Sequence, residues 1–373
     1  MIRNSTRSSV NGLRTLLSQH SSTLTKSTRL HQSTLAFIET NTDGGILKHS
    51  QSALEASKKL NASEGVVAVL VGSSSDKAVP NLTKLAQTYN IQKILYSDNS
   101  ALDHYSPELV TPLLQQILSS NGNSEISHIL FSASAVGKSI LPRLSATLNV
   151  QCINDIVDIK DKKTYIRPIY AGNLLSTIEN NQKTQLISIR SSAFPIQESL
   201  DQQENSGAAP QVVKVEYTTP SAQEVHAAEY VESKLLESER PDLGSAQVIV
   251  SGGRGLKNKE NFDKLMIPLA DAFAKLPKFK NVPAAIGATR AAVDSGFCDN
   301  SLQIGQTGKV VAPELYVACG VSGAIQHLAG MKNSKVIVNI NKEEDQPLQD
   351  ISDYTLIGDV NEILPELTEK LVQ

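Results

Sequence analysis

The stretch that decides the fold is VIVSGGRGLKNKENF, residues 248–262, in which an apolar run leads into a glycine-rich loop and then into a helix-like segment. Three glycines in the four positions 252–255 allow a tight turn and a close approach of the backbone to a ligand. The free N–H groups of such a loop, together with the positive end of the following helix, suit a phosphate. Arg254 stands inside the turn, where a guanidinium can bind phosphate through two hydrogen bonds, the alternative being a plain strand–helix turn with a solvated arginine.

Further loops of this type follow in the same half of the chain. They are Gly287–Arg290, Gln303–Gly308 and Gly320–His327, together with the pair Asn341 and Asp359. Each closes an apolar, strand-like run. A hydroxyl and a cation at a helix start, Thr289 and Arg290, suit an anion, although Thr289 could simply cap the helix and leave Arg290 in solvent. Together the loops predict a long, phosphate-rich ligand across the strand ends of an open α/β sheet.

These segments resemble the alpha-subunit family of electron transfer flavoproteins. The resemblance is carried by VIVSGGRGLKNKENF, IGATRAAVDSGF, QIGQTGKVVAPELYVACGVSGAIQHLAGM and VNINK, and it extends more loosely from about Thr34 to the C-terminus. It implies FAD as the cofactor, bound mainly by a second domain and closed over by a smaller beta subunit in a heterodimer. Serine is usual in the family where Thr289 stands, so the hydroxyl is kept.

The resemblance also implies roles for individual residues. Arg290 lies against the flavin ring, Thr307 hydrogen-bonds its N5 edge and His327 addresses its O2 side, so these three tune its redox behaviour. Arg254, Ser322 and the backbone of residues 323–326 are expected to bind the ribityl chain and the pyrophosphate. Asn341 and Asp359 are expected to contact the adenosine end. The full set of expected cofactor-binding residues is Arg254, Thr289, Arg290, Ile304, Gly305, Gln306, Thr307, Ser322, Gly323, Ala324, Ile325, Gln326, His327, Asn341, Asp359 and Val360.

The expected function is electron transfer without substrate turnover by the chain itself. The five loops hold donors and cations but no nucleophile–base arrangement, which suits a protein that tunes a bound cofactor. The resemblance implies electrons taken from acyl-CoA and related matrix dehydrogenases and passed to electron transfer flavoprotein-ubiquinone oxidoreductase, in fatty-acid beta-oxidation and amino-acid catabolism. Two alternatives stay open: an NAD-dependent enzyme with a second domain like that of deoxyhypusine synthase, which needs a catalytic lysine or base, and a scaffold with a vestigial site.

Residues 1–32 differ in kind from the rest. Five cations are spread through Ser, Thr and Leu, and no acidic residue precedes Glu39. This composition predicts a mitochondrial transit peptide and a matrix location, with the mature chain beginning between Arg29 and Thr34. A disordered tail is the alternative.

From Thr34 onward, short apolar runs alternate with amphipathic ones, which predicts two α/β domains, each a mostly parallel sheet covered by helices. We expect a Rossmann-like first domain at 33–236, which contacts the beta subunit, and a doubly wound FAD-binding second domain at 237–373. The first-domain strands are expected at 34–39, 66–71, 93–96, 128–131, 152–159, 185–190 and 212–217, and the helices at 52–60, 79–89, 107–118 and 138–148. An antiparallel ribbon at 165–178, an exposed loop at 201–210 and a charged helix at 221–239 complete the domain. In the second domain, strands are expected at 246–250, 284–286, 310–312, 315–318, 336–340 and 354–358.

Several other functions are disfavoured. Ser132–Ser139 ends like a phosphate-binding P-loop, but Ser132 stands where that loop needs its first glycine, so a strand-to-helix turn is the better interpretation. A net charge of −3 argues against nucleic-acid binding, and no apolar run approaches the roughly 20 residues that cross a membrane. The three cysteines, Cys152, Cys298 and Cys319, lack metal-type or C-x-x-C spacing and are expected to be free thiols, and no metal site is expected.

Overall fold

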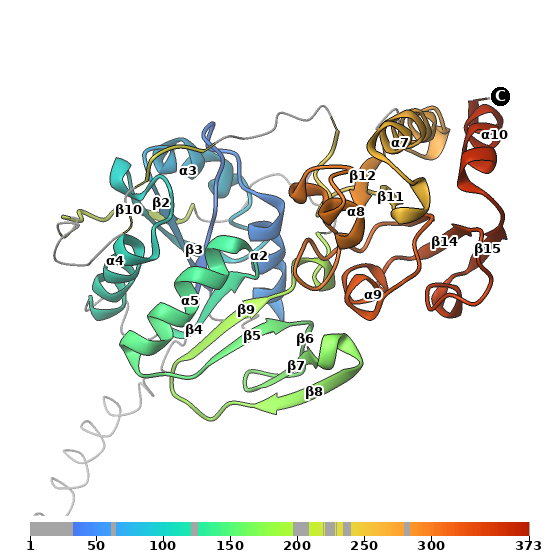
Figure 1. Cartoon of the computed structure of the whole chain (residues 1–373). Coiled ribbons are helices and arrows are strands. Elements are labelled where there is room, and N and C mark those ends of the chain that lie inside the picture. Colours follow the sequence, from blue (N-terminus) through green and yellow to red (C-terminus); the bar gives the residue numbers. More distant parts are fainter. Residues whose placement is uncertain are drawn as a thin grey trace, which may run out of the picture. The chain divides into compact units, whose positions relative to one another are not determined.

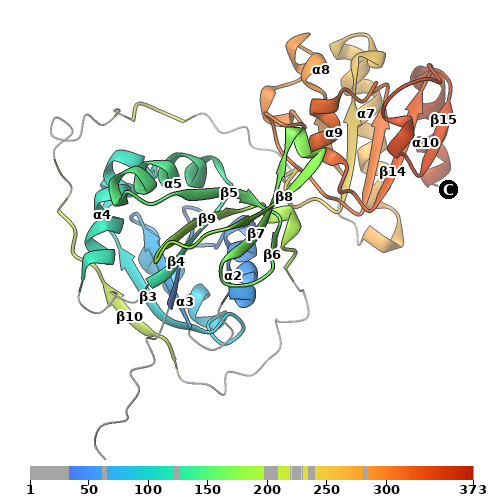
Figure 2. The same cartoon turned by 90° about the horizontal axis from the view of Figure 1, so that it is seen from below.

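The computed structural model describes residues 33–60, 65–120, 126–196, 209–218, 220, 228, 230–233, 240–279 and 284–372. Within these residues the chain forms a seven-stranded sheet, a five-stranded sheet and a small three-stranded sheet (Figures 1 and 2). Both large sheets are parallel throughout and covered by helices, so the α/β prediction is confirmed. The expected transit peptide at 1–32 lies outside the described residues.

The seven-stranded sheet has the order β10-β3-β2-β1-β4-β9-β5. Its strands are β1 (Ser33–Phe37), β2 (Val66–Val71), β3 (Ile91–Ser97), β4 (Ile126–Ser132), β5 (Cys152–Ile156), β9 (Gln185–Ile189) and β10 (Gln211–Lys214). The chain builds outward from β1 to β3 on one side and then starts again with β4 on the other. The strand order therefore reverses between β1 and β4, which is the crevice where Rossmann-like sheets bind ligands.

Four helices cover this sheet: α2 (Lys48–Leu60), α3 (Ser75–Lys84), α4 (Pro107–Ser119) and α5 (Ala135–Leu148). The period-2 alternation of the strands sends neighbouring residues to opposite faces, so Leu35 joins the cluster under α4 and α5, while Ala36 joins the cluster with Leu54 of α2 and Leu82 of α3. Figure 1 shows these two helix layers on either side of the strands.

Three expectations for this part need correction. The strand expected at 152–159 is two strands, because Asp155 takes a left-handed φ of 59° and the register shifts there; β6 (Asp158–Ile159) joins the small sheet instead. The helix expected at 79–89 runs from Ser75 to Lys84, since it begins directly after Ser74 with acidic Asp76 in its first turn. The helix expected at 221–239 lies mostly outside the described residues, and its described residues (228 and 230–233) are not helical.

The remaining features of the first part agree with expectation. β7 (Thr164–Ile169) and β8 (Leu174–Glu179) form the antiparallel ribbon. β10 returns to the edge of the sheet beside β3 and covers the first half of the strand expected at 212–217, since residues 215–217 are not in a strand. The loop expected at 201–210 is described only at 209–210, where it is irregular.

The five-stranded sheet has the order β12-β11-β13-β14-β15. Its strands are β11 (Val248–Gly252), β12 (Ala285–Ala288), β13 (Leu315–Cys319), β14 (Val336–Asn341) and β15 (Tyr354–Ile357). This is a doubly wound order whose reversal lies between β11 and β13. Residues 310–312, expected as a strand, belong to no strand; they run through Pro313 into β13, and Val311 donates its N–H to the Gly330 carbonyl instead.

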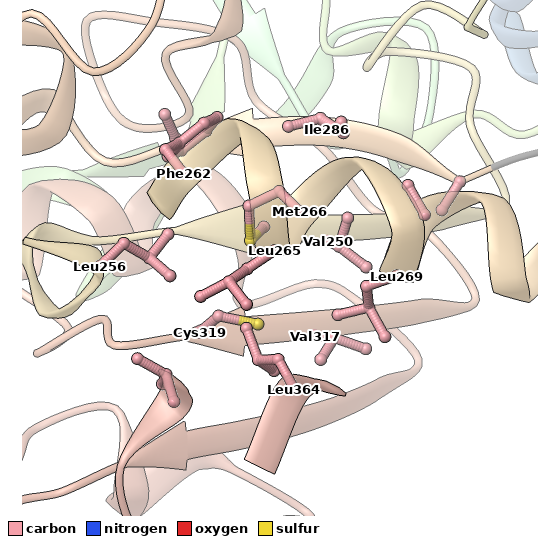
Figure 3. Packing of buried hydrophobic residues seen from close by; sticks show 14 of the residues in the cluster. Val250, Leu256, Phe262, Leu265, Met266, Leu269, Ile286, Val317, Cys319 and Leu364 are labelled. Carbon is pink, nitrogen blue, oxygen red and sulfur yellow. The ribbon is translucent and has the colours of Figure 1, made fainter. Parts of the chain in front are cut away.

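Helices α7 (Lys259–Ala274) and α10 (Val360–Val372) pack on one face of this sheet, and α9 (Ile325–Met331) packs on the other. Figure 3 shows Met266 and Leu269 of α7 against Val250 and Val317, with Leu364 of α10 beside them. Burying a side chain of this size contributes about 1.5–3 kcal/mol. Among the described residues each hydrophobic cluster draws on only one of the two large sheets, so each has its own core.

The two loops at the reversal of the second sheet touch through their backbones. Gly253 donates its N–H to the Cys319 carbonyl at 2.9 Å, and Gly255 donates to the Gly320 carbonyl at 3.1 Å. A Cβ at Gly253 would lie 2.1 Å from the Gly320 oxygen, so only glycine fits there. The sequence SGGRG is therefore required by the packing of β11 against β13, and it leaves Arg254 outside on the rim.

Candidate cofactor site

The expected site residues gather at one edge of the five-stranded sheet, because all five strands are parallel and their carboxyl ends coincide. Backbone hydrogen bonds link the loops: Thr289 N–H to the Gly252 carbonyl at 3.0 Å, Gly320 N–H to the Ile340 carbonyl at 2.8 Å, and Gly358 N–H to the Asn341 carbonyl at 2.9 Å. Residues 254, 289–290, 322–326 and 359 follow β11, β12, β13 and β15 respectively, and Asn341 is the last residue of β14. The structure thus joins the loops that the sequence analysis grouped.

These residues divide into an exposed rim and a buried support. The exposed set is Arg254, Arg290, Gln306, Thr307, Ser322, Ala324, Ile325 and Gln326, while Thr289, Ile304, Gly305, Gly323, His327 and Val360 are buried. The Arg254 guanidinium has no partner among the described residues, and Ile325, at the start of α9, is 58% exposed. Unpaired donors beside an exposed apolar side chain are the usual lining of a ligand site.

Thr289 and Arg290 behave differently from one another. The Thr289 hydroxyl accepts the Ala292 N–H at 3.3 Å and caps α8 (Arg290–Asp294). Arg290 is exposed, with Nε 3.4 Å from the Asp294 carboxylate, an exposed pair that holds the side chain weakly. The capping alternative is therefore realised for Thr289, while the Arg290 cation remains available to a ligand.

The loop Gln303–Lys309 is held between β12 and α9. Ile304 donates its N–H to the Ala288 carbonyl at 2.9 Å, and Gln306 donates to the Gln326 carbonyl at 2.8 Å. The loop therefore reaches the sheet edge from a fixed base, with Gln306 and Thr307 exposed at its tip.

His327 is only 5% exposed, and both of its ring nitrogens bond within the chain. Nδ1 lies 3.0 Å from the Ile304 carbonyl oxygen, and Nε2 lies 2.9 Å from the Tyr316 hydroxyl. A carbonyl only accepts, so Nδ1 carries the proton and Nε2 accepts from Tyr316. Burial lowers the pKa of His327 to about 4. The ring is thus neutral and ties the 303–309 loop to α9; a bond from it to a ligand requires Nε2 to leave Tyr316.

Asn341 and Asp359 stand at the far end of the edge. Asn341 donates through Nδ2 to the Val321 carbonyl at 2.9 Å, which ties the ends of β13 and β14. The pKa of Asp359 is lowered by the Asn361 backbone N–H, then by the Asn361 side chain, with Lys257 3.5 Å away, so the carboxylate is ionised and accepts donors. Lys257 and Tyr316 were not expected to belong to the site, and Gln303 was expected only as part of its loop. The one signal in the sequence was the hydroxyl group of Tyr316, which needs a partner inside an apolar strand.

The corresponding edge of the seven-stranded sheet is filled by the chain's own carboxylates. Glu39, 4% exposed, accepts from the Ser132 hydroxyl at 2.9 Å and from Ser134, the residue that caps α5. Asp103 accepts both the N–H and the hydroxyl of Ser73 after β2. Gly137 lies inside α5, so the P-loop-like segment is a strand-to-helix turn, as expected.

The described part of the chain contains no group of three or more His, Cys, Asp or Glu placed to hold a metal ion. The three cysteines are unpaired, and burial raises the pKa of Cys298 to about 11 and that of Cys319 to about 12, which keeps both protonated. No helix in the described ranges combines the length and the apolar composition of a membrane span.

The neutral state of His327 predicts a pH dependence of stability. The folded-state pKa lies below the unfolded value of about 6.5, so the unfolded chain gains a proton first as pH falls. Stability should be lost between about pH 6.5 and pH 4, by up to about 3 kcal/mol. Urea unfolding of wild type and of His327→Gln, at pH 8 and pH 5, should show the larger loss in wild type. Equal losses in both proteins would contradict a buried neutral histidine.

Comparison with known proteins identifies the family. Residues 34–220 match the electron transfer flavoprotein domain, and residues 242–332 match the electron transfer flavoprotein FAD-binding domain. A probable electron transfer flavoprotein subunit alpha, mitochondrial, of Saccharomyces cerevisiae is 49% identical over 91% of this chain and 93% of its own length. The mitochondrial subunit alpha of Dictyostelium discoideum is 40% identical (91% and 92%), and subunit alpha of Pseudomonas aeruginosa is 40% identical (88% and 98%). The FAD-binding match confirms FAD as the cofactor, and the chain belongs to the alpha-subunit family of electron transfer flavoproteins.

Proposed function

We propose that this chain is the FAD-carrying subunit of a heterodimeric electron carrier in the mitochondrial matrix. It accepts electrons from acyl-CoA and related dehydrogenases and delivers them to electron transfer flavoprotein-ubiquinone oxidoreductase, in fatty-acid beta-oxidation and amino-acid catabolism. The observation that carries the proposal is the gathering of an unpaired arginine, other donors and cations at the carboxyl ends of the strands of the five-stranded sheet, among the described residues. The family's electron-carrier role and its mitochondrial relatives support it.

The residues of this edge fit FAD from end to end. Arg254 and the loop 322–326 offer a cation, a hydroxyl and backbone N–H groups to the pyrophosphate. Asp359 offers an ionised acceptor to hydroxyl or amino groups of the adenosine end. Arg290, Thr307 and the loop tied down by His327 face the ring. When bound, FAD supplies the one-electron redox chemistry, while the chain binds, orients and sets the local charge.

A transit peptide at residues 1–32 accounts for the matrix location. The segment carries five cations and no acidic residue, which is the composition of an imported leader. Residues 33–236 then form the domain that meets the beta subunit, and residues 237–373 form the FAD-binding domain. The separate cores of the two large sheets support this division.

Association with a beta subunit is supported by the surface of β15. This strand ends the five-stranded sheet, and Tyr354 (67%), Leu356 (49%) and Ile357 (41%) are exposed on it. An edge strand that carries several exposed apolar side chains is a candidate surface for contact with another chain. In the first sheet, Glu39 and Asp103 already occupy the donors that a nucleotide phosphate would need. We therefore assign that domain to contact with the beta subunit and not to nucleotide binding.

A visible absorption spectrum tests the proposal as a whole. The chain purified with its beta subunit should carry a yellow chromophore that denaturation releases as FAD. Purified alone, it should aggregate or lose the chromophore, because β15 and the FAD edge are then uncovered. A colourless heterodimer that needs added NAD for activity would favour the NAD-dependent alternative, and a stable, flavin-loaded monomer at micromolar concentration would contradict the need for a partner.

Arg290 should influence the potential of the flavin more than its binding. Arg290→Ala removes a cation beside the ring and leaves the loops at 251–255 and 322–327 intact, so the one-electron potential should fall by tens of mV (~59 mV corresponds to ~1.4 kcal/mol). Arg290→Lys should lie between, since it keeps the charge but loses the planar fork.

The measurement is a reductive titration with the FAD content determined in parallel. Lys264→Ala, which removes an exposed cation of α7, is the control and should leave the potential unchanged. Loss of FAD from Arg290→Ala, with an unchanged potential for the flavin that remains, would contradict the tuning role.

A further inference from the structure

The side chain of Gln303 crosses the loop that carries Thr307. Its backbone is fully used: Gln303 donates its N–H to the Asn300 carbonyl at 3.1 Å and accepts the Lys309 N–H at 2.8 Å. Its side-chain amide donates through Nε2 to the Thr307 hydroxyl oxygen at 2.9 Å. Gln303 is 8% exposed, whereas Thr307 is exposed at the tip. A buried residue thus supports an exposed hydroxyl from below.

The chemistry of the two groups fixes the direction of this hydrogen bond. An amide nitrogen donates and cannot accept, so the Thr307 oxygen is the acceptor. The Thr307 proton is therefore not donated to Gln303 and is free for another acceptor at the loop tip. The hydroxyl is offered as a donor rather than as an acceptor.

The loop holds this geometry firmly. Gly305 donates to the Lys309 carbonyl at 3.2 Å, and Gly308 donates to the Gly305 carbonyl at 3.2 Å. A Cβ at Gly308 would lie 2.3 Å from the backbone carbonyl oxygen of Gln303, so the loop closes tightly over its base. The charged residue of the loop, Lys309, is paired with Asp242 at 2.5 Å and so does not compete for the Thr307 hydroxyl.

We propose that Gln303 is a positioning residue, whose amide holds the Thr307 hydroxyl as a donor to a lone-pair acceptor on the ring of bound FAD. The inference rests on the proposed function, in which Thr307 faces that ring. Because Gln303 keeps Thr307 as a donor, the contact favours cofactor states in which the contacted ring nitrogen keeps its lone pair. It disfavours states in which that nitrogen carries a proton. Thr307 makes the contact, and Gln303 decides which way the contact points.

Gln303→Glu tests the proposal because it keeps size and reverses the hydrogen bond. The ionised carboxylate accepts the Thr307 proton, so Thr307 turns a lone pair toward the ring. The dissociation constant of oxidised FAD from the heterodimer should rise roughly fivefold at pH 8, which corresponds to about 1 kcal/mol. Burial raises the pKa of an introduced carboxyl group, and once protonated this group donates to Thr307 again. Affinity relative to wild type should therefore recover toward pH 5, whereas a purely structural defect would not follow this profile.

A double-mutant cycle shows whether Gln303 acts through Thr307. In a Thr307→Val background, Gln303→Glu should change FAD affinity far less than in wild type, because there is no hydroxyl to turn. Gln349→Glu, which adds the same charge at an exposed site in the short 3-10 helix Gln349–Ile351 between β14 and β15, is the matched control and should leave the affinity unchanged. The thermal midpoint of each variant is measured alongside.

The outcomes separate the inference from the proposed function. Equal effects of Gln303→Glu with and without the Thr307 hydroxyl, or an effect that does not change with pH, would overturn the positioning role while FAD binding stands. A wild-type heterodimer that binds no FAD would contradict the proposed function, and the inference would fail with it.

Discussion

The contact between the first two loops of the second sheet is the constraint on which the site depends. Gly253 and Gly255 bond to the carbonyls of Cys319 and Gly320, and the space between these backbones admits no side chain. This contact lies where the strand order reverses, so the loops after β11 and β13 diverge on either side of it and leave their outer N–H groups and Arg254 exposed. The loops after the remaining strands reach the same end of the sheet, and the Gln303–Lys309 loop, which follows no strand of this sheet, is held there by its hydrogen bonds to Ala288 and Gln326.

The two large sheets reverse their strand order in the same way but differ in what fills the crevice. In the seven-stranded sheet, Glu39 holds the hydroxyls of Ser132 and Ser134, and Asp103 holds the backbone and hydroxyl of Ser73. These two carboxyl groups, the buried Glu39 and the exposed Asp103, already occupy the donors that an incoming phosphate would need. In the five-stranded sheet no carboxylate takes these positions among the described residues of the β11 and β13 loops, and the Arg254 guanidinium has no partner in the described part of the chain. The two sheets therefore share a topology, but the donors at the crevice are occupied by the chain's own carboxyl groups in the seven-stranded sheet and remain available to a ligand in the five-stranded sheet.

Much of this could be predicted from local pattern. Apolar runs closed by glycine, hydroxyl or amide residues located the strands and the edge, since parallel strands place such loops together. The expected start of α3 was four residues too late, because Ser74 and Asp76 begin the helix before its apolar positions suggest. The division of β5 from β6 depends on one left-handed residue, Asp155, which has no periodic signal. The bonds of His327 to Tyr316 and of Gln303 to Thr307 join residues whose side-chain directions only the folded sheet fixes. The contact of His327 with the flavin stays a prediction, and it requires Nε2 of the His327 ring to give up its hydrogen bond with the Tyr316 hydroxyl.

Hydrogen–deuterium exchange of the heterodimer, with FAD bound and after its removal, tests the central claim most directly. FAD removal should raise exchange in peptides covering residues 252–256, 303–309 and 320–327. Exchange should stay unchanged in peptides covering residues 39–45, 72–76 and 132–138, where the chain's own carboxylates already hold the loops. Exchange that rises at the first sheet and stays constant at the second would contradict it.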